Sequence, residues 1–198
     1  MRKGEVMNKT KRKIFETSMK LFAEKGYDAT SIEEITATVG VAKGTLYYHF
    51  SSKEEIFNFL VEEGMKLLKN SIEIKTSKFD NVIDKIRAII LIEIKVLVKY
   101  EHIITIILTQ FWGPESRNLS WQSYVLDYVI TVEDIIKEGM KKNEIPNGNA
   151  KIMASTIFSL TYSVLVYKLQ SGQTLNVQEL YNEYQDIIIN GLLNTGNN

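Results

Sequence analysis

Apolar residues recur along this chain at the three- and four-residue spacing of amphipathic helices, and no convincing segment alternates apolar with polar residues as a strand does. Several segments begin with Ser or Asn followed three residues later by Glu, which is typical of a helix start. Glycines end others. The pattern predicts an all-α protein of about nine helices, over residues 9–25, 31–39, 43–50, 52–72, 78–100, 101–112, 120–142, 150–170 and 176–193.

The order of the predicted helices suggests two parts. Three short helices come first, and longer, more apolar helices follow. We therefore expect a small N-terminal head over residues 1–52, joined to a larger C-terminal helical bundle over residues 53–198.

Two of the short helices meet at a tight turn around Gly40, which is the helix-turn-helix pattern. Ile35, Val39 and Leu46 supply a small core, and what remains on the second helix is polar or aromatic. Such a face can enter the major groove of DNA, while a helix start and nearby lysines can bind phosphate. The candidate DNA-contacting residues are Thr30, Lys43, Gly44, Thr45, Tyr47, Tyr48, His49 and Lys53. The alternative is that the tyrosines belong to the core of the head, as we expect for Phe50.

Charge and composition limit the partners and the classes of function that we expect for this chain. The formal net charge is zero, but residues 1–50 hold nine Lys or Arg against six Asp or Glu. A basic N-terminal arm suggests a polyanionic partner, although a solvated, frayed terminus would look the same. The chain has no cysteine and two histidines, which disfavours a metal site, and no catalytic motif is present, so we expect neither an enzyme nor a cofactor.

We also expect a cytoplasmic protein that does not enter a membrane. No apolar core follows the basic N-terminal residues, so a secretory signal is not predicted. The most apolar stretch, residues 88–112, is interrupted by charged residues before it reaches the length of a membrane span.

Residues 9–60 resemble the DNA-binding head of the TetR/AcrR family of one-component repressors. The resemblance is carried by Leu21-Phe-Ala-Glu-Lys-Gly-Tyr27, by Thr30-Ser-Ile-Glu-Glu-Ile35, and by the run from Val39 through Lys43-Gly-Thr-Leu-Tyr-Tyr-His49 to Ile56. Ser18 and Thr36 depart from the family's small alanines, for which we expect slightly looser packing. Residues 61–198 agree with the family in architecture only.

The resemblance implies a homodimer that binds a palindromic DNA operator and is released by a small-molecule effector in the C-terminal bundle. The function expected is therefore a ligand-responsive transcriptional regulator, most simply a repressor. The alternatives are an activator and an all-helical small-molecule-binding protein without repressor activity.

The C-terminal part offers candidate effector-binding residues. Glu93 falls inside the apolar arc of its helix, where a carboxylate must be paired, hydrogen-bonded or protonated. It could anchor a largely apolar ligand, or bond internally to a tyrosine, His102 or a lysine. The aromatic residues nearby could line a pocket or simply form core. The candidate ligand-binding residues are Ile90, Glu93, Leu97, Phe111, Trp112, Trp121, Tyr124, Tyr128, Phe158 and Tyr162.

The last two predicted helices have the pattern of a self-association surface. Residues 176–193 carry a broad apolar stripe, and residues 150–170 mix apolar residues with small ones that permit close helix approach: Ala154, Ser155, Ser159 and Ser163. Two such helices from each subunit would make a four-helix dimer interface. Alternatively, they only cover the 78–100 helix of their own chain.

Overall fold

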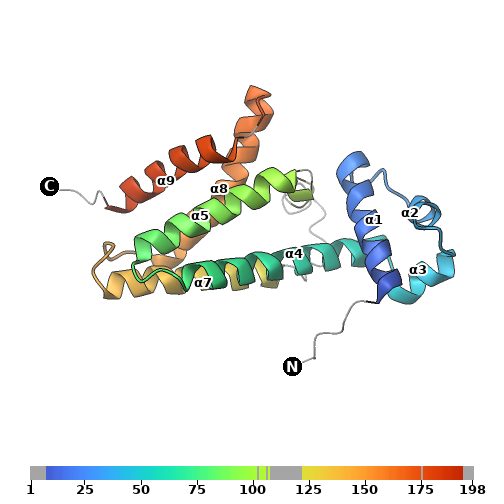
Figure 1. Cartoon of the computed structure of the whole chain (residues 1–198), viewed down its shortest axis with the longest axis horizontal. Helices are drawn as coiled ribbons and strands as arrows, with labels where there is room; N and C mark the ends of the chain where they lie inside the picture. Colours follow the sequence, from blue (N-terminus) through green and yellow to red (C-terminus); the bar gives the residue numbers. More distant parts are fainter. Residues whose placement is uncertain (1–7, 102, 106, 108–121, 175, 194–198) are drawn as a thin grey trace. The chain divides into compact units, whose positions relative to one another are not determined.

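The computed structural model describes residues 8–101, 103–105, 107, 122–174 and 176–193, without the side chains of residues 122, 161, 162, 169, 192 and 193. Within these residues the chain forms helices and no strand, which confirms the all-α class (Figure 1). The helices are α1 (Lys9–Lys25), α2 (Ile32–Val39), α3 (Lys43–His49), α4 (Lys53–Thr76), α5 (Val82–Lys99), α7 (Gln122–Lys141), α8 (Ala150–Ser171) and α9 (Val177–Leu193). Most of the helix predicted over residues 101–112 lies outside the described residues.

The chain divides into two compact units. The first comprises residues 1–63 and 102–117, and the second residues 64–101 and 118–198. The division falls inside α4, so this helix belongs to both units, whereas the sequence suggested a functional boundary at residue 52. The assignment of residues 1–52 to DNA binding and 53–198 to ligand binding and dimerisation stays a prediction.

The core of the first unit follows the predicted apolar stripes. Ile14, Leu21 and Phe22 of α1 are buried, as are Ile35 and Val39 of α2, Leu46 of α3, and Phe50 beyond it. Ser18 and Thr36, at the two positions where the resemblance implies alanine, are also buried. The Ser18 hydroxyl donates to the Ile14 carbonyl at 2.8 Å, and that of Thr36 donates to the Glu33 carbonyl at 2.9 Å. Each hydroxyl is thus satisfied by its own helix.

Side-chain caps fix most helix starts, but not all as predicted. Ser31 accepts from the Glu34 amide at 3.1 Å, yet the Glu34 carboxylate pairs with Lys25 instead of returning to Ser31, so only half of that capping box forms. Asn81 caps α5 by accepting from the Asp84 amide at 2.7 Å. The helix therefore starts later than the predicted residue 78, and the preceding α4 extends to Thr76.

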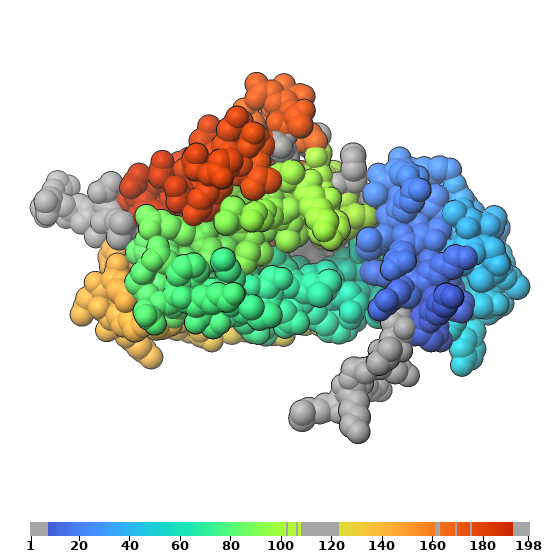
Figure 2. Space-filling view, viewed as in Figure 1, coloured from blue at the N-terminus to red at the C-terminus, as the bar shows by residue number. Residues whose placement is uncertain are grey.

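In the second unit, α5 packs against α7, α8 and α9, and α7 packs against α8. Figures 1 and 2 show α9 lying along α5. The interior is built from aliphatic side chains of all four helices. Its most deeply buried members include Ile86, Ile89, Ile90 and Ile94 of α5, Val132 and Ile136 of α7, Ala154 and Val164 of α8, and Leu180 of α9.

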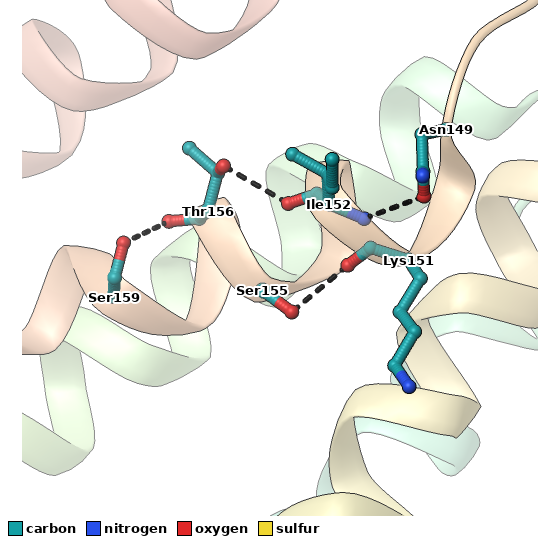
Figure 3. A pocket seen from close by; sticks show the side chains of 6 residues that line it. All are labelled: Asn149, Lys151, Ile152, Ser155, Thr156 and Ser159. Carbon is teal, nitrogen blue, oxygen red and sulfur yellow. Dashed lines mark hydrogen bonds between the residues drawn. The ribbon is translucent and has the colours of Figure 1, made fainter.

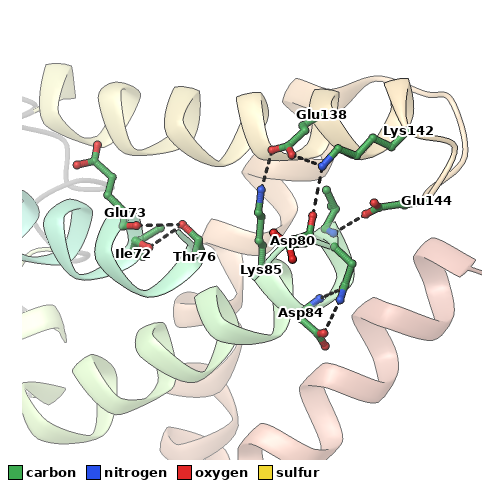
Figure 4. Close-up of polar contacts among 11 residues, drawn as sticks. Ile72, Glu73, Thr76, Asp80, Asp84, Lys85, Glu138, Lys142 and Glu144 are labelled. Carbon is green, nitrogen blue, oxygen red and sulfur yellow. Dashed lines mark hydrogen bonds and ion pairs between the residues drawn. The ribbon is translucent and has the colours of Figure 1, made fainter. Parts of the chain in front are cut away.

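A polar network joins the start of α5 to the end of α7 (Figure 4). The Glu138 carboxylate accepts from Lys85 at 2.8 Å and from Lys142 at 2.6 Å, and these two bonds lower the pKa of Glu138 to about 2. Lys142 also donates to the Asp80 carbonyl at 3.2 Å, and Glu144 accepts from the Val82 amide. These bonds lie beside the close contact between Val82 of α5 and Gly139 of α7. They therefore fix the start of α5 against the end of α7.

Candidate nucleic-acid interface and ligand site

The short helix α3 presents a bare face. Its only buried residue is Leu46, which fixes the side that turns toward the head's core. Tyr48 is 83% exposed and Tyr47 is 46% exposed. Lys43 and Gly44 are also exposed, while Thr45 and His49 are half-buried. The tyrosines are therefore not core residues.

The turn before α3 sets the angle at which this face is presented. Gly40 has a φ of 77°, in the left-handed region, and its amide donates to the Thr36 carbonyl at 2.9 Å. The amide of Val41 donates to the same carbonyl at 3.1 Å. The Thr36 carbonyl at the end of α2 thus has hydrogen-bond donors, and α3 can begin directly after the turn. This agrees with the tight turn predicted around Gly40.

Two acidic residues of α2 make ion pairs with its neighbours. Glu33 pairs with Lys43 of α3 at 2.5 Å, and Glu34 pairs with Lys25 of α1. The hydrogen bond between Glu33 and Lys43 lowers the pKa of the carboxyl and raises that of the ammonium. Both partners are more than half exposed, so a DNA phosphate could replace the carboxylate.

Two of the candidate phosphate contacts have partners within the chain. The Lys53 ammonium donates to the carbonyls of Tyr27 at 2.8 Å and Thr30 at 2.9 Å, and it lies 4.4 Å from the centre of the Tyr27 ring. The Thr30 hydroxyl is buried and donates to the Gly26 carbonyl at 2.8 Å. These side chains thus hold the start of α4 and the turn before α2 together. The sequence signal for this was absent, because the carbonyls that Lys53 binds are brought together only by the fold.

Glu93 is 4% exposed, in the middle of α5. The Tyr128 hydroxyl, from α7, donates to its Oε1 atom, and the Tyr128 ring lies 5.3 Å from that of Phe158 on α8. The Oε2 atom is buried and has no hydrogen-bond partner among the described residues. Desolvation raises the pKa of Glu93 to about 8, and the bond from Tyr128 opposes that shift. Of the internal partners considered for Glu93, the structure shows the tyrosine.

The other candidate ligand residues are only partly placed. Ile90 and Leu97 are fully buried, and Phe158 is half-buried. Tyr124 is half-buried, with the Lys66 ammonium 5.9 Å from its ring centre. The remaining candidates lie outside the described residues, as does His102, or have an undescribed side chain: Phe111, Trp112, Trp121 and Tyr162.

A shallow depression runs along the outer side of α8 (Figure 3). Its lining consists of Asn149, Lys151, Ile152, Ser155, Thr156 and Ser159. The three hydroxyls donate hydrogen bonds to carbonyls of the same helix, so they need no hydrogen-bond acceptor from another molecule. Ala154 is buried within its own unit, so it does not belong to this outer side as the small-residue pattern suggested. Ile152, which the helical pattern of the sequence did not indicate as a surface residue, is 63% exposed.

In the described part of the chain, no group of three His, Cys, Asp or Glu residues could hold a metal ion. One helix, over Ala150–Lys168 of α8, is long and apolar enough to cross a membrane, with a mean hydropathy of 1.3 and 38% of its window buried. A single helix of this kind is weak support for a membrane span, because core and interface helices of folded domains pass the same test.

The head matches known regulators. Residues 14–60 match the family model of bacterial regulatory proteins, tetR family. The HTH-type transcriptional regulator YerO of Bacillus subtilis is 41% identical over 68 residues, which are 32% of this chain and 24% of YerO. IcaR of Staphylococcus aureus strain Newman, the negative regulator of the biofilm operon icaADBC, is 39% identical over 74 residues, 37% of this chain and 40% of IcaR. The aligned segments thus span less than half of these curated relatives.

The fold of the whole chain matches solved structures. A candidate regulator of fatty acid metabolism from Clostridium perfringens superposes with a TM-score of 0.80 at 29% identity, covering 91% of this chain and 98% of that one. FadR of Bacillus subtilis, solved with stearoyl-CoA, superposes with a TM-score of 0.78 at 20% identity and the same coverage. The second likeness concerns the fold alone.

An exposed α3 that follows a glycine turn is the geometry of a helix-turn-helix head, a class of domain that transcription regulators use. Over residues 14–60 the head is similar to the tetR family of bacterial regulatory proteins. The family model and the curated relatives that match this head are named as regulatory proteins.

Proposed function

We propose that this protein is a cytoplasmic, ligand-responsive transcriptional repressor that binds a palindromic operator as a homodimer. The observation that carries the proposal is the exposure of Tyr47 and Tyr48 on a seven-residue helix whose one buried residue is Leu46. Large aromatic side chains at such positions hold apolar surface in water unless a partner covers them. The helix α3 also follows a glycine turn, as a recognition helix does.

Within α3, residue type suggests the roles. Thr45 can meet a thymine methyl or a base edge, and Gly44 lets the backbone approach closely. Lys43 and His49 can contact phosphate or guanine, and the tyrosine hydroxyls can donate to phosphate. Thr30 and Lys53 act indirectly, by holding the turn before α2.

For the dimer interface we propose the outer sides of α8 and α9. The apolar window of α8 is only 38% buried within the chain, and Ile152, Tyr167 and Ile187 are 63%, 47% and 67% exposed. A second copy of the chain would cover these residues and the shallow depression beside Ile152. Half-sites of the operator would then lie about one helical turn apart, or a multiple of it.

The effector would be a small, largely apolar molecule bound among α5, α7 and α8. FadR of Bacillus subtilis was solved with stearoyl-CoA, and AibR with isovaleryl coenzyme A and operator DNA. Acyl thioesters are therefore the first class of effector to test. Because α4 belongs to both compact units, it is the element through which effector and DNA binding would be coupled, by equal factors in both directions.

The test is binding to the intergenic DNA beside the protein's own gene, measured by fluorescence anisotropy at several salt concentrations. We expect log K to fall steeply with log salt concentration, by about 0.9 for each phosphate contacted. Tyr48→Ala should weaken operator binding at least about tenfold, as expected when a buried contact is lost. Tyr100→Ala removes another exposed tyrosine, outside the head, and should leave affinity unchanged.

Equal affinity of wild type and Tyr48→Ala for the operator would remove α3 from the interface. A protein that binds effector but no DNA would instead be the all-helical ligand-binding protein considered as the alternative. An activator would bind DNA and raise transcription from the same promoter.

A further inference from the structure

The surroundings of Glu93 are unusual for a carboxyl group. Its buried neighbours along α5 are aliphatic, among them Ile89, Ile90, Ile94 and Leu97. From the facing helices come the Tyr128 hydroxyl and, behind it, the Phe158 ring. The described residues supply Glu93 with no cationic partner. Burying a carboxylate under these conditions is costly, so the neutral acid is favoured.

The hydrogen-bonding arrangement then places the acid proton. Tyr128 donates to Oε1, so the proton of a neutral Glu93 belongs on Oε2. That oxygen is buried and unpartnered. At neutral pH the carboxyl is protonated, because burial raises the pKa of Glu93 to about 8. Among the described residues of the second unit, this buried O–H donor therefore has no acceptor, which folded proteins seldom tolerate without a functional reason.

We infer that Glu93, held by Tyr128, donates a hydrogen bond to a neutral carbonyl oxygen of an otherwise apolar effector. This inference rests on the proposed function, since it names the chemical class of ligand that the bundle receives. The carbonyl of a ketone, ester, thioester or amide satisfies the Oε2–H group without bringing charge into the interior. Ile90 and Phe158 supply apolar surface for the rest of the molecule.

The same arrangement disfavours effectors that would bring a charged group next to Glu93. An amine would have to take the proton and leave two opposite charges in the apolar interior, where desolvation cancels most of their attraction. A carboxylate would carry its own charge into the same place. A plain hydrocarbon would leave the donor unpaired and gain only apolar burial.

Matched probes test the inference on the full-length protein at pH 7. We would measure dissociation constants for 2-undecanone, undecane and undecylamine by calorimetry. The ketone should bind about tenfold more tightly than the alkane, the increment of one hydrogen bond to a buried donor. The amine should bind no more tightly than the alkane.

Three variants locate the effect. Glu93→Leu removes the donor and should bind ketone and alkane with equal affinity, with its fold checked by circular dichroism. Glu93→Gln keeps an N–H donor and should preserve the preference for the ketone. Glu73→Gln changes an exposed glutamate of α4 and should behave as the wild type.

The inference is overturned if the wild type binds neither ketone nor alkane, if it does not prefer the ketone, if Glu93→Leu keeps that preference, or if the amine binds best. Failure of the proposed function looks different. If the protein prefers the ketone but the ketone does not release it from operator DNA, the inference about Glu93 stands and the proposed repressor mechanism fails. If a compound releases both the wild type and Glu93→Leu from the operator equally well, the repressor mechanism stands and the inference about Glu93 fails.

Discussion

The Lys53 ammonium donates to backbone carbonyls of the turn between α1 and α2, and this contact changes the role expected of it. A lysine at the surface of a DNA-binding head suggests a phosphate contact. Here the ammonium is occupied, and through it the first turn of α4 is attached to the residues that precede α2. Lys53 is therefore a positioning residue, whose loss should affect the head's geometry more than its charge.

Replacing Lys53 with methionine separates the two roles. We expect Lys53→Met to destabilise the protein by about 1–2 kcal/mol, since charge-assisted hydrogen bonds are lost, and to lower its Tm by about 2–4 °C per kcal/mol. Operator affinity should fall while the salt slope stays unchanged. Lys43→Met should leave Tm unchanged and reduce the slope by about one, as expected for a phosphate contact. A reduced slope in Lys53→Met would restore Lys53 to the phosphate contacts.

The buried Glu93 predicts an unusual pH dependence of stability. Its pKa is about 8 in the folded protein and about 4.5 when exposed, so between these values the folded state holds a proton that the unfolded state has released. Stability is therefore lost as pH rises through this window, by at most about 1.4 kcal/mol per pH unit. Glu93→Gln lacks this loss, so its Tm minus that of the wild type should grow from pH 5 to pH 8.5. For Glu73→Gln the difference should stay constant with pH. A constant difference for Glu93→Gln would mean that Glu93 is solvated.

At the scale of the elements, the sequence predicted existence and type well and the ends less well. Asn149 caps α8 and Asn176 caps α9: their side chains accept from the Ile152 and Glu179 amides at 3.1 Å and 3.2 Å. Asn81, followed three residues later by Asp84, also has the pattern of a helix start. The apolar Phe79 before it continues the helical stripe, so the start predicted at residue 78 is too early. Tertiary contacts decided the rest. Glu34 bonds Lys25 instead of completing its capping box, and no local pattern reveals which of two partners is nearer.

The site shows the same division. Helical periodicity placed Glu93 in the apolar arc and left Leu46 as the inward residue of α3, because both depend on one helix alone. That Tyr128 would be the partner of Glu93 depends on the register of α7 against α5. The carbonyls that receive Lys53 depend on the packing of α4 against the turn after α1. Neither is encoded in a spacing along the chain.

The crossing of α5 and α7 depends on one glycine. A Cβ atom at Gly139 would lie 2.7 Å from Cγ1 and 2.9 Å from Cβ of Val82, closer than packed atoms can approach. We expect Gly139→Ala to destabilise the protein by about 1–3 kcal/mol, despite the better helix propensity of alanine. Gly64→Ala is the matched control, because nothing lies within 4 Å of the added atom, and it should stabilise by up to about 1 kcal/mol. Thermal unfolding of both variants measures the contrast, and equal shifts would show that the crossing can relax.

For the molecule as a whole, the exposed outer side of α8 is the surface that bears on assembly. Its outer side combines a hydroxyl-rich depression with exposed apolar residues, and the proposed partner is a second copy of the chain. Such pairing would also give the proposed operator contact its two-fold symmetry, since each copy would contribute one α3.

A pair of lysine substitutions tests this assembly. Ile152 on α8 and Ile74 on α4 are 63% and 65% exposed. The two side chains are therefore almost equally exposed, and only Ile152 lies on the proposed interface. By analytical ultracentrifugation, Ile152→Lys should shift the protein from dimer toward monomer and lower operator affinity, because charge is buried at the interface. Ile74→Lys should sediment as the wild type. Dimers of unchanged affinity in Ile152→Lys would place the interface elsewhere.

The ion pair between Lys43 and Glu33 has a consequence for how such a regulator searches a genome. Since a carboxylate of the same chain holds the ammonium between encounters, a phosphate on random sequence gains this lysine only by displacing Glu33, and the net attraction is small. Stretches without an operator are then abandoned sooner. Under the proposed function, residence would be long only where α3 also contacts base edges, so Glu33 would shorten the time that the protein spends on DNA without an operator.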